Sequence, residues 1–94
     1  MDVITTWRHL FAAVLGLVSE QGTVDQRLRE AYLGGLSRIS GNPGLPEHLQ
    51  GDYEKLMTEL ADLFAEPGPV DVKRASQLAK RVVALYDRVT RELQ

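Results

Sequence analysis

The fold is decided by the segment Leu10-Phe11-Ala12-Ala13-Val14-Leu15-Gly16-Leu17-Val18. It is a run of consecutive apolar or small residues inside a longer segment, residues 5–20, whose pattern predicts a helix. A helix on a protein surface normally carries one apolar stripe and a polar back. This segment is apolar on nearly every side, so either the rest of its own chain or a second copy has to surround it.

Steps of three and four residues along this helix predict the side that faces the core. The predicted inner row is Ile4, Trp7, Phe11, Val14 and Val18. Further leucines widen the apolar side beyond one stripe, namely Leu10, Leu15 and Leu17. We therefore expect this helix to be the most buried one or to form a subunit interface.

A second helix is predicted over residues 23–39. Thr23, followed by Gln26 three residues later, has the pattern of a capping box at a helix start. Gly34 and Gly35 lie inside the predicted helix, where each glycine costs about 1 kcal/mol relative to alanine. Two structural reasons could justify that cost, a close crossing with another helix or an early end to this one.

Two turns separate the remaining helices, one around the Asn-Pro-Gly sequence at 42–44 and one around the Pro-Gly-Pro sequence at 67–69. Between and after them we expect helices over residues 46–65 and 71–93, the last with Asp71 as its N-cap. The apolar residues of this last helix form a heptad seam, Val72, Ala75, Ala79, Val82, Tyr86, Val89 and Leu93.

The whole pattern predicts an all-α fold, an antiparallel four-helix bundle in one domain spanning residues 1–94. The chain contains no cysteine, which excludes disulfides and thiolate chemistry and favours a reducing, cytoplasmic setting. The apolar run is far shorter than the about 20 residues that span a bilayer. Asp2 stands where a signal peptide carries positive charge, so we expect no membrane insertion.

No pattern indicates a catalytic residue, a metal site or a cofactor, and we expect a protein that is not an enzyme. His48 and Asp52 are one helical turn apart, but a metal site needs three or four ligands. Histidine phosphotransfer domains are helical bundles of similar size whose reactive histidine is followed by a lysine and a glycine. Here Gly51 stands one place early and no lysine is adjacent, which makes phosphotransfer a distant alternative.

The predicted last helix carries a row of bases, Lys73, Arg74, Lys80, Arg81 and Arg88. Such a row can follow a nucleic-acid backbone, so nucleic-acid association is an alternative function. However, the chain has a net charge of −2, and residues 47–66 carry six acids against one base. We therefore expect the bases to pair with this acidic neighbour, where the complementary charges help select the helix pairing.

The first helix is the best candidate for function. We expect it to bind a second copy, giving a homodimer, or another helical protein. Tryptophan is favoured at binding hot spots, and the single tryptophan of the chain lies in this helix. The expected interface residues are Trp7, Leu10, Phe11, Val14, Leu17 and Val18.

Overall fold

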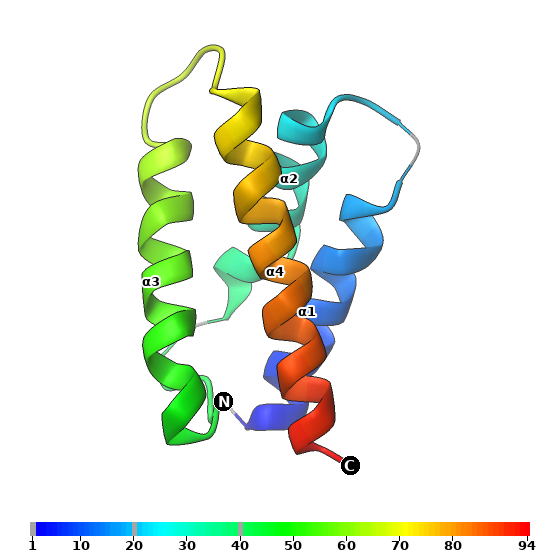
Figure 1. Ribbon diagram of the computed structural model, residues 1–94, viewed down its shortest axis with the longest axis vertical. Helices are drawn as coiled ribbons and strands as arrows, with labels where there is room; N and C mark the ends of the chain where they lie inside the picture. The colour runs from blue at the N-terminus through cyan, green and yellow to red at the C-terminus, as the bar shows by residue number, and fades with distance from the viewer. Residues whose placement is uncertain (1, 20, 40) are drawn as a thin grey trace.

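The described part of the chain folds into four α-helices, and consecutive ones run in opposite directions (Figure 1). The computed structural model describes residues 2–19, 21–39 and 41–94. The helices in these ranges are α1 (Val3–Leu17), α2 (Val24–Gly34), α3 (Glu47–Leu63) and α4 (Val72–Glu92), with a short 3₁₀ helix, η1 (Leu36–Arg38), after α2. The predicted all-α antiparallel bundle is confirmed. The first helix was expected to reach Glu20, which falls outside the described residues, as does Ser40 between the second and third helices; α1 ends at Leu17.

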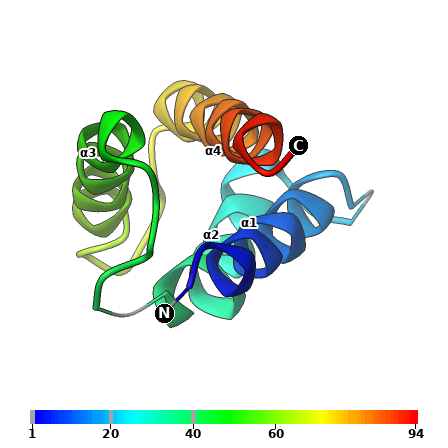
Figure 2. The same cartoon turned by 90° about the horizontal axis from the view of Figure 1, so that it is seen from below.

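The central helix of the bundle is α4. It packs against α1, α2 and α3, whereas α3 packs chiefly against α4 alone. The view from below shows α3 and α1 on opposite sides of α4, with α2 beside α1 (Figure 2). Although α4 has neighbours on three sides, α1 is the least exposed helix, as expected: four of its 15 residues are exposed, against 11 of 21 in α4.

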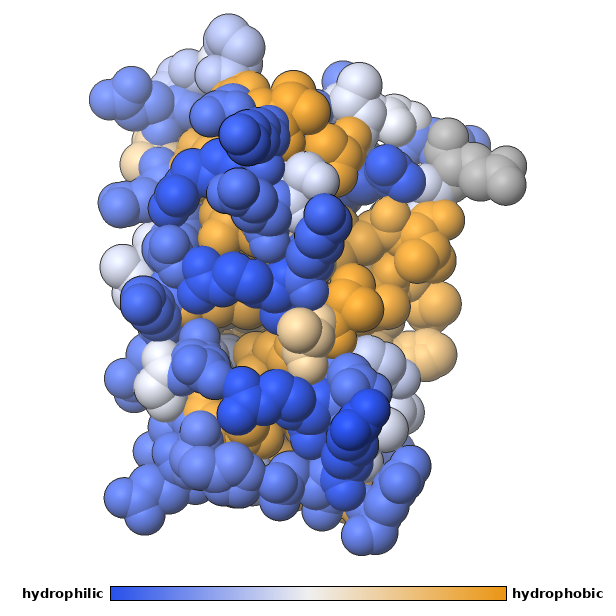
Figure 3. All heavy atoms as spheres, viewed as in Figure 1, coloured by the Kyte–Doolittle hydropathy of each residue, from blue (hydrophilic) through white to orange (hydrophobic). Residues whose placement is uncertain are grey.

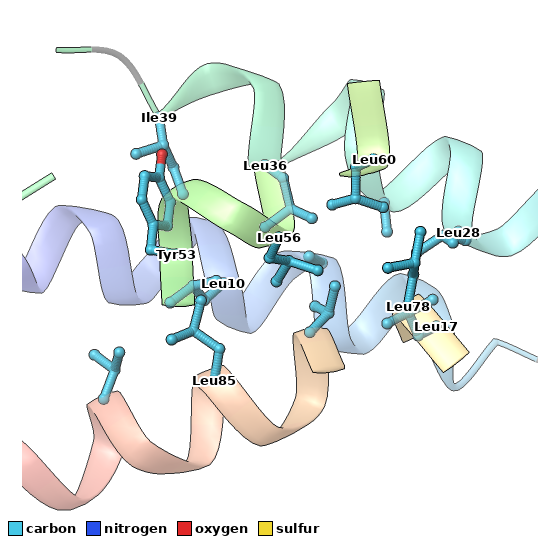
Figure 4. Packing of buried hydrophobic residues seen from close by; sticks show 14 of the residues in the cluster. Leu10, Leu17, Leu28, Leu36, Ile39, Tyr53, Leu56, Leu60, Leu78 and Leu85 are labelled. Atoms are coloured by element: carbon cyan, nitrogen blue, oxygen red, sulfur yellow. The ribbon is translucent and has the colours of Figure 1, made fainter. Parts of the chain in front are cut away.

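All four helices contribute leucines to one core, and these side chains point toward one another (Figure 4). On α1 the buried row is Thr6, Leu10, Ala13 and Leu17. The row predicted to face inward, residues 4, 7, 11, 14 and 18, lies about a third of a turn further around the helix. The spacing of the predicted row is correct, but the side of the helix that it assigns to the core is wrong. Both rows are largely apolar because the apolar side of α1 is wide, so the spacing alone does not distinguish them. On α4 the buried row is Ala75, Leu78, Val82, Leu85 and Val89, again shifted slightly from the predicted seam.

The second helix ends at Gly34, five residues before the predicted end. The next residue, Gly35, leaves the helical conformation at φ −132° and ψ −66° and lies against α1. A Cβ atom on Gly35 would come 3.1 Å from the carbonyl oxygen of His9. Both reasons considered for the glycine pair therefore hold at Gly35, since the helices cross closely there and α2 stops. The chain then continues through η1, which brings Leu36 into the core.

The starts of α2 and α4 follow the predicted local chemistry, whereas α1 begins at Val3, two residues before its predicted start, with Asp2 as its N-cap. The backbone amide of Thr23 donates to the Gln26 side-chain oxygen at 3.1 Å. The carboxylate of Asp71 accepts from the amide of Lys73 at 3.0 Å. Asp2 accepts from the amide of Thr5 at 2.8 Å, and that hydrogen bond holds the pKa of Asp2 below its usual value. Each bond satisfies a backbone donor that the first helical turn leaves without a partner.

Two side chains form hydrogen bonds that join α1 to other parts of the chain. The hydroxyl of Thr6, which is fully buried, donates to the carbonyl oxygen of Pro43 at 2.5 Å and ties the second connection to the core. Arg27 Nη1 donates to the carbonyl oxygens of Leu17 at 3.2 Å and Ser19 at 2.9 Å. This guanidinium from α2 supplies donors and positive charge to the end of α1, which has no basic residue in its own last turn.

Candidate protein-interaction face

Three aromatic rings form the centre of the seam between α1 and α4. The ring of Trp7 stacks on Tyr86 at 5.8 Å between centroids, and Phe11 meets both rings edge-on at 5.5 and 6.1 Å. Trp7 Nε1 donates to the hydroxyl of Thr90 at 2.7 Å. Because the polar group of the tryptophan is satisfied and its ring is packed on two sides, this half-buried side chain is held in one orientation.

Exposed aliphatic side chains continue the apolar surface on both sides of these rings. Leu15 of α1 is 57% exposed, and Val18, the residue that follows α1, is 63% exposed. Figure 3 shows hydrophobic surface gathered where α1 lies beside α4, with mainly hydrophilic surface on the α3 side. We define the α1–α4 face as Ile4, Trp7, Phe11 and Leu15 of α1 and Val83 of α4, with Val18 and Leu93, the residues that directly follow α1 and α4.

The α1–α4 face is hollowed at each end of the seam. One groove, of about 300 Å³, is lined chiefly by Leu17, Val18, Val24, Ala79 and Val83. The other, of about 350 Å³, is lined by Ile4, Trp7, Thr90, Leu93 and Gln94. A face with apolar projections between two shallow apolar grooves is suited to interlocking with another apolar helical surface.

The structure divides the predicted interface residues into two groups. Val18 is exposed, and Trp7, Phe11 and Val14 are partly buried along the seam. Leu10 is 0% exposed and Leu17 is 9% exposed. These two leucines belong to the buried row of α1, so they are core residues and their predicted place in the interface is wrong.

Sequence reasoning did not assign Ile4, Leu15, Val83 or Leu93 to the interface. For Leu15 a signal was present, since residues 4, 8, 11, 15 and 18 form a second row with steps of four and three on the outer side of α1. Arg8 is the one charged member of that row. Val83 could not be assigned, because it joins the face only through the packing of α4 beside α1.

The arginines of the predicted basic row are paired across the α3–α4 edge. Arg74 Nη2 lies 3.2 Å from Glu59 Oε1, Arg81 bonds the other oxygen of Glu59, and Arg88 bonds Asp52. The hydrogen bond from Arg81 is the main reason that the pKa of Glu59 lies below its ordinary value. The expected pairing of acids on the third helix with bases on the fourth is confirmed.

The remaining bases of the row, Lys73 and Lys80, are exposed. Without the three arginines they do not make a continuous basic stripe. A groove of about 200 Å³ lies between Arg81 and Arg88 over Leu56 and Leu85. Its arginines already face Glu59 and Asp52, so its charge is largely compensated.

His48 lies on the surface near the start of α3, and its Nε2 atom is 2.7 Å from Glu92 Oε1. The described residues contain no group of three or more metal-binding side chains around this histidine or elsewhere. In the same ranges, no helix combines the length and hydropathy that crossing a bilayer takes. At this surface His48 and Glu92 form an exposed side-chain hydrogen bond between the start of α3 and the end of α4.

Comparison with known proteins finds no family model that matches the chain, and neither a curated protein nor a solved structure matches it significantly.

Proposed function

We propose that the protein is a small, non-enzymatic helical interaction module that self-associates as a homodimer through the α1–α4 face. The observation that carries the proposal is the exposure of Leu15 and Val18, both above 50%, beside a rigid aromatic cluster. Large exposed apolar surfaces on a small protein typically mark sites of association. A reducing, cytoplasmic setting is part of the proposal, since the chain lacks cysteine.

The exposed side chains indicate the strength of the association. Burying a whole Val, Leu or Ile side chain contributes about 1.5–3 kcal/mol. Five aliphatic residues of the face are each about half exposed, namely Ile4, Leu15, Val18, Val83 and Leu93. Two copies together then gain roughly 10 kcal/mol, which is comparable with the about 4–15 kcal/mol that association costs. We expect weak, concentration-dependent dimers in the micromolar to millimolar range.

A second copy is favoured over nucleic acid as the partner. The apolar character of the α1–α4 face suits another apolar surface. Nucleic-acid binding would use the basic row of α4, in which Arg74, Arg81 and Arg88 are already bonded to carboxylates. Competition from a phosphate backbone would have to break these internal pairs.

The proposal is tested with two matched leucine variants. Leu15→Glu places a charge in the α1–α4 face, whereas Leu33→Glu places the same charge on α2 at a leucine that is 60% exposed and lines neither groove of the face. Both substitutions affect exposed helical leucines, so both variants should keep the fold, which circular dichroism checks. Light scattering after size exclusion should show a concentration-dependent mass for wild type and Leu33→Glu only. Equal masses for the two variants at every concentration would refute the assigned face.

A further inference from the structure

The α1–α4 face is flanked by one charged residue on α1 and one of opposite charge on α4, both at the same level along the helix axes. Arg8 follows Trp7 on α1, and Asp87 follows Tyr86 on α4. Because Trp7 stacks on Tyr86, Arg8 and Asp87 lie at one level of the seam. Both side chains are exposed, and they lie on different helices of the pair, with the seam between them.

A face made of two antiparallel helices can meet its copy in two symmetric ways. If the two-fold axis lies in the interface and is perpendicular to the helix axes, α1 of one copy packs on α1 of the other. If the two-fold axis is parallel to the helix axes, α1 of each copy packs on α4 of the other. In this second case each residue keeps its position along the helix axis, so residues at the same level in one copy face each other across the interface. In either arrangement each contact occurs twice.

The charges favour the second arrangement. In an α1-on-α1 dimer Arg8 faces another copy of α1. Apart from Arg8, residues 3–17 contain no Asp, Glu, Lys or Arg, so this helix offers Arg8 no acidic partner. In an α1-on-α4 dimer, Arg8 of each copy faces Asp87 of the other. We infer that the two copies pack α1 on α4 and that reciprocal Arg8–Asp87 ion pairs at the rim of the α1–α4 face set this orientation. This inference rests on the proposed self-association.

Within the part of the chain that the structure describes, neither side chain has a strong partner. Arg8 makes no ion pair with any residue in the described ranges. Asp87 lies 3.2 Å from Arg91 Nε one turn along α4, with both side chains more than half exposed. An exposed pair of this kind is weak, and a carboxylate has room for a second donor.

Charge-reversal variants distinguish specific Arg8–Asp87 ion pairs from a general effect of net charge on dimerisation. Arg8→Asp changes the net charge from −2 to −4, and Asp87→Arg changes it from −2 to zero. General repulsion between like-charged chains predicts that Asp87→Arg tightens the dimer. The reciprocal pairs predict the opposite, because Arg8 then faces an arginine twice.

The experiment is sedimentation equilibrium on wild type, both single variants, the double variant Arg8→Asp with Asp87→Arg, and Arg38→Asp. Arg38 is an exposed residue of η1 outside the face, and its variant matches the net charge of Arg8→Asp. We expect each reversal at Arg8 or Asp87 to weaken dimerisation about tenfold, and the double variant to return to within about threefold of wild type. Arg38→Asp should show only the smaller effect of net charge.

The outcomes distinguish the orientation from the association itself. If wild type dimerises and Leu15→Glu abolishes it, but Asp87→Arg dimerises as well as wild type or better, the α1-on-α4 orientation is wrong and the proposed face stands. A failure of the double variant to regain affinity, with its helical circular dichroism intact, also overturns the ion pair. If wild type itself never dimerises, the proposed function and this inference fall together.

Discussion

The closest approach between α1 and α2 gives a sharp test of the packing. At Gly35 an added Cβ atom would lie 3.1 Å from the carbonyl oxygen of His9 and 3.2 Å from that of Ala31. Both oxygens are backbone atoms, so relief of the contact has to move a helix or the start of η1. Overpacking of this kind typically costs about 1–3 kcal/mol. Because φ is negative at Gly35, −132°, alanine does not have to adopt the left-handed conformation there, and its lower entropy in the unfolded chain offsets about 0.4–1 kcal/mol. We expect Gly35→Ala to lower the free energy of unfolding by about 1–2 kcal/mol.

The neighbouring glycines provide matched controls. At Gly34, within α2, an added Cβ meets no atom within 4 Å, so Gly34→Ala should stabilise the fold by about 0.4–1 kcal/mol. At Gly16 the nearest atom is the Cβ of Ala31 at 3.8 Å, an ordinary contact, and alanine should also be tolerated. Urea unfolding at one fixed protein concentration measures all three variants. A Gly35→Ala variant as stable as Gly34→Ala would refute the close crossing of the two helices.

Three further changes probe the loop attachments and the ion pairs. Thr6→Val keeps the shape of the side chain but removes the donor from the buried Thr6 hydroxyl to the Pro43 carbonyl oxygen, and chemical denaturation should show a loss of about 1–3 kcal/mol. Arg27→Met removes both donors to the end of α1; hydrogen exchange of the last turn of α1 should become faster, and unchanged protection would contradict the capping role. Since Arg81 lowers the pKa of Glu59 in the folded chain, the stability from this pair is present above the unfolded pKa and is lost as pH falls through the folded one. Acid titration of unfolding should therefore be less steep for Glu59→Gln, and an unchanged slope would count against the pair.

The helices were predictable because their limits depend on local chemistry. A proline fixes its own backbone angle, and a capping side chain needs an amide only two or three residues away. Thus the start of α4 follows from Asp71 and the start of α2 from Thr23 and Gln26. The end of α2 was not predictable in this way, since a tertiary contact between Gly35 and α1 accompanies it.

The inward side of α1 was assigned wrongly for a related reason. Its buried row includes Thr6, whose hydroxyl makes that row look less apolar than the row through Phe11. The hydroxyl is satisfied by Pro43, 37 residues away, and no local pattern shows such a contact. For the basic row, opposite charge was enough to predict pairing between the two helices. That Arg74 and Arg81 share Glu59 depends on the register of the helices and was visible only in the structure.

The most direct test of the central claim is the mass of the wild-type chain in solution, measured by sedimentation equilibrium from a few micromolar to about one millimolar. The α1–α4 face predicts an average mass that rises from 10.5 kDa toward twice that value as concentration increases. A mass that stays at 10.5 kDa over the whole range would contradict self-association, and the exposed residues of the face would then need another explanation.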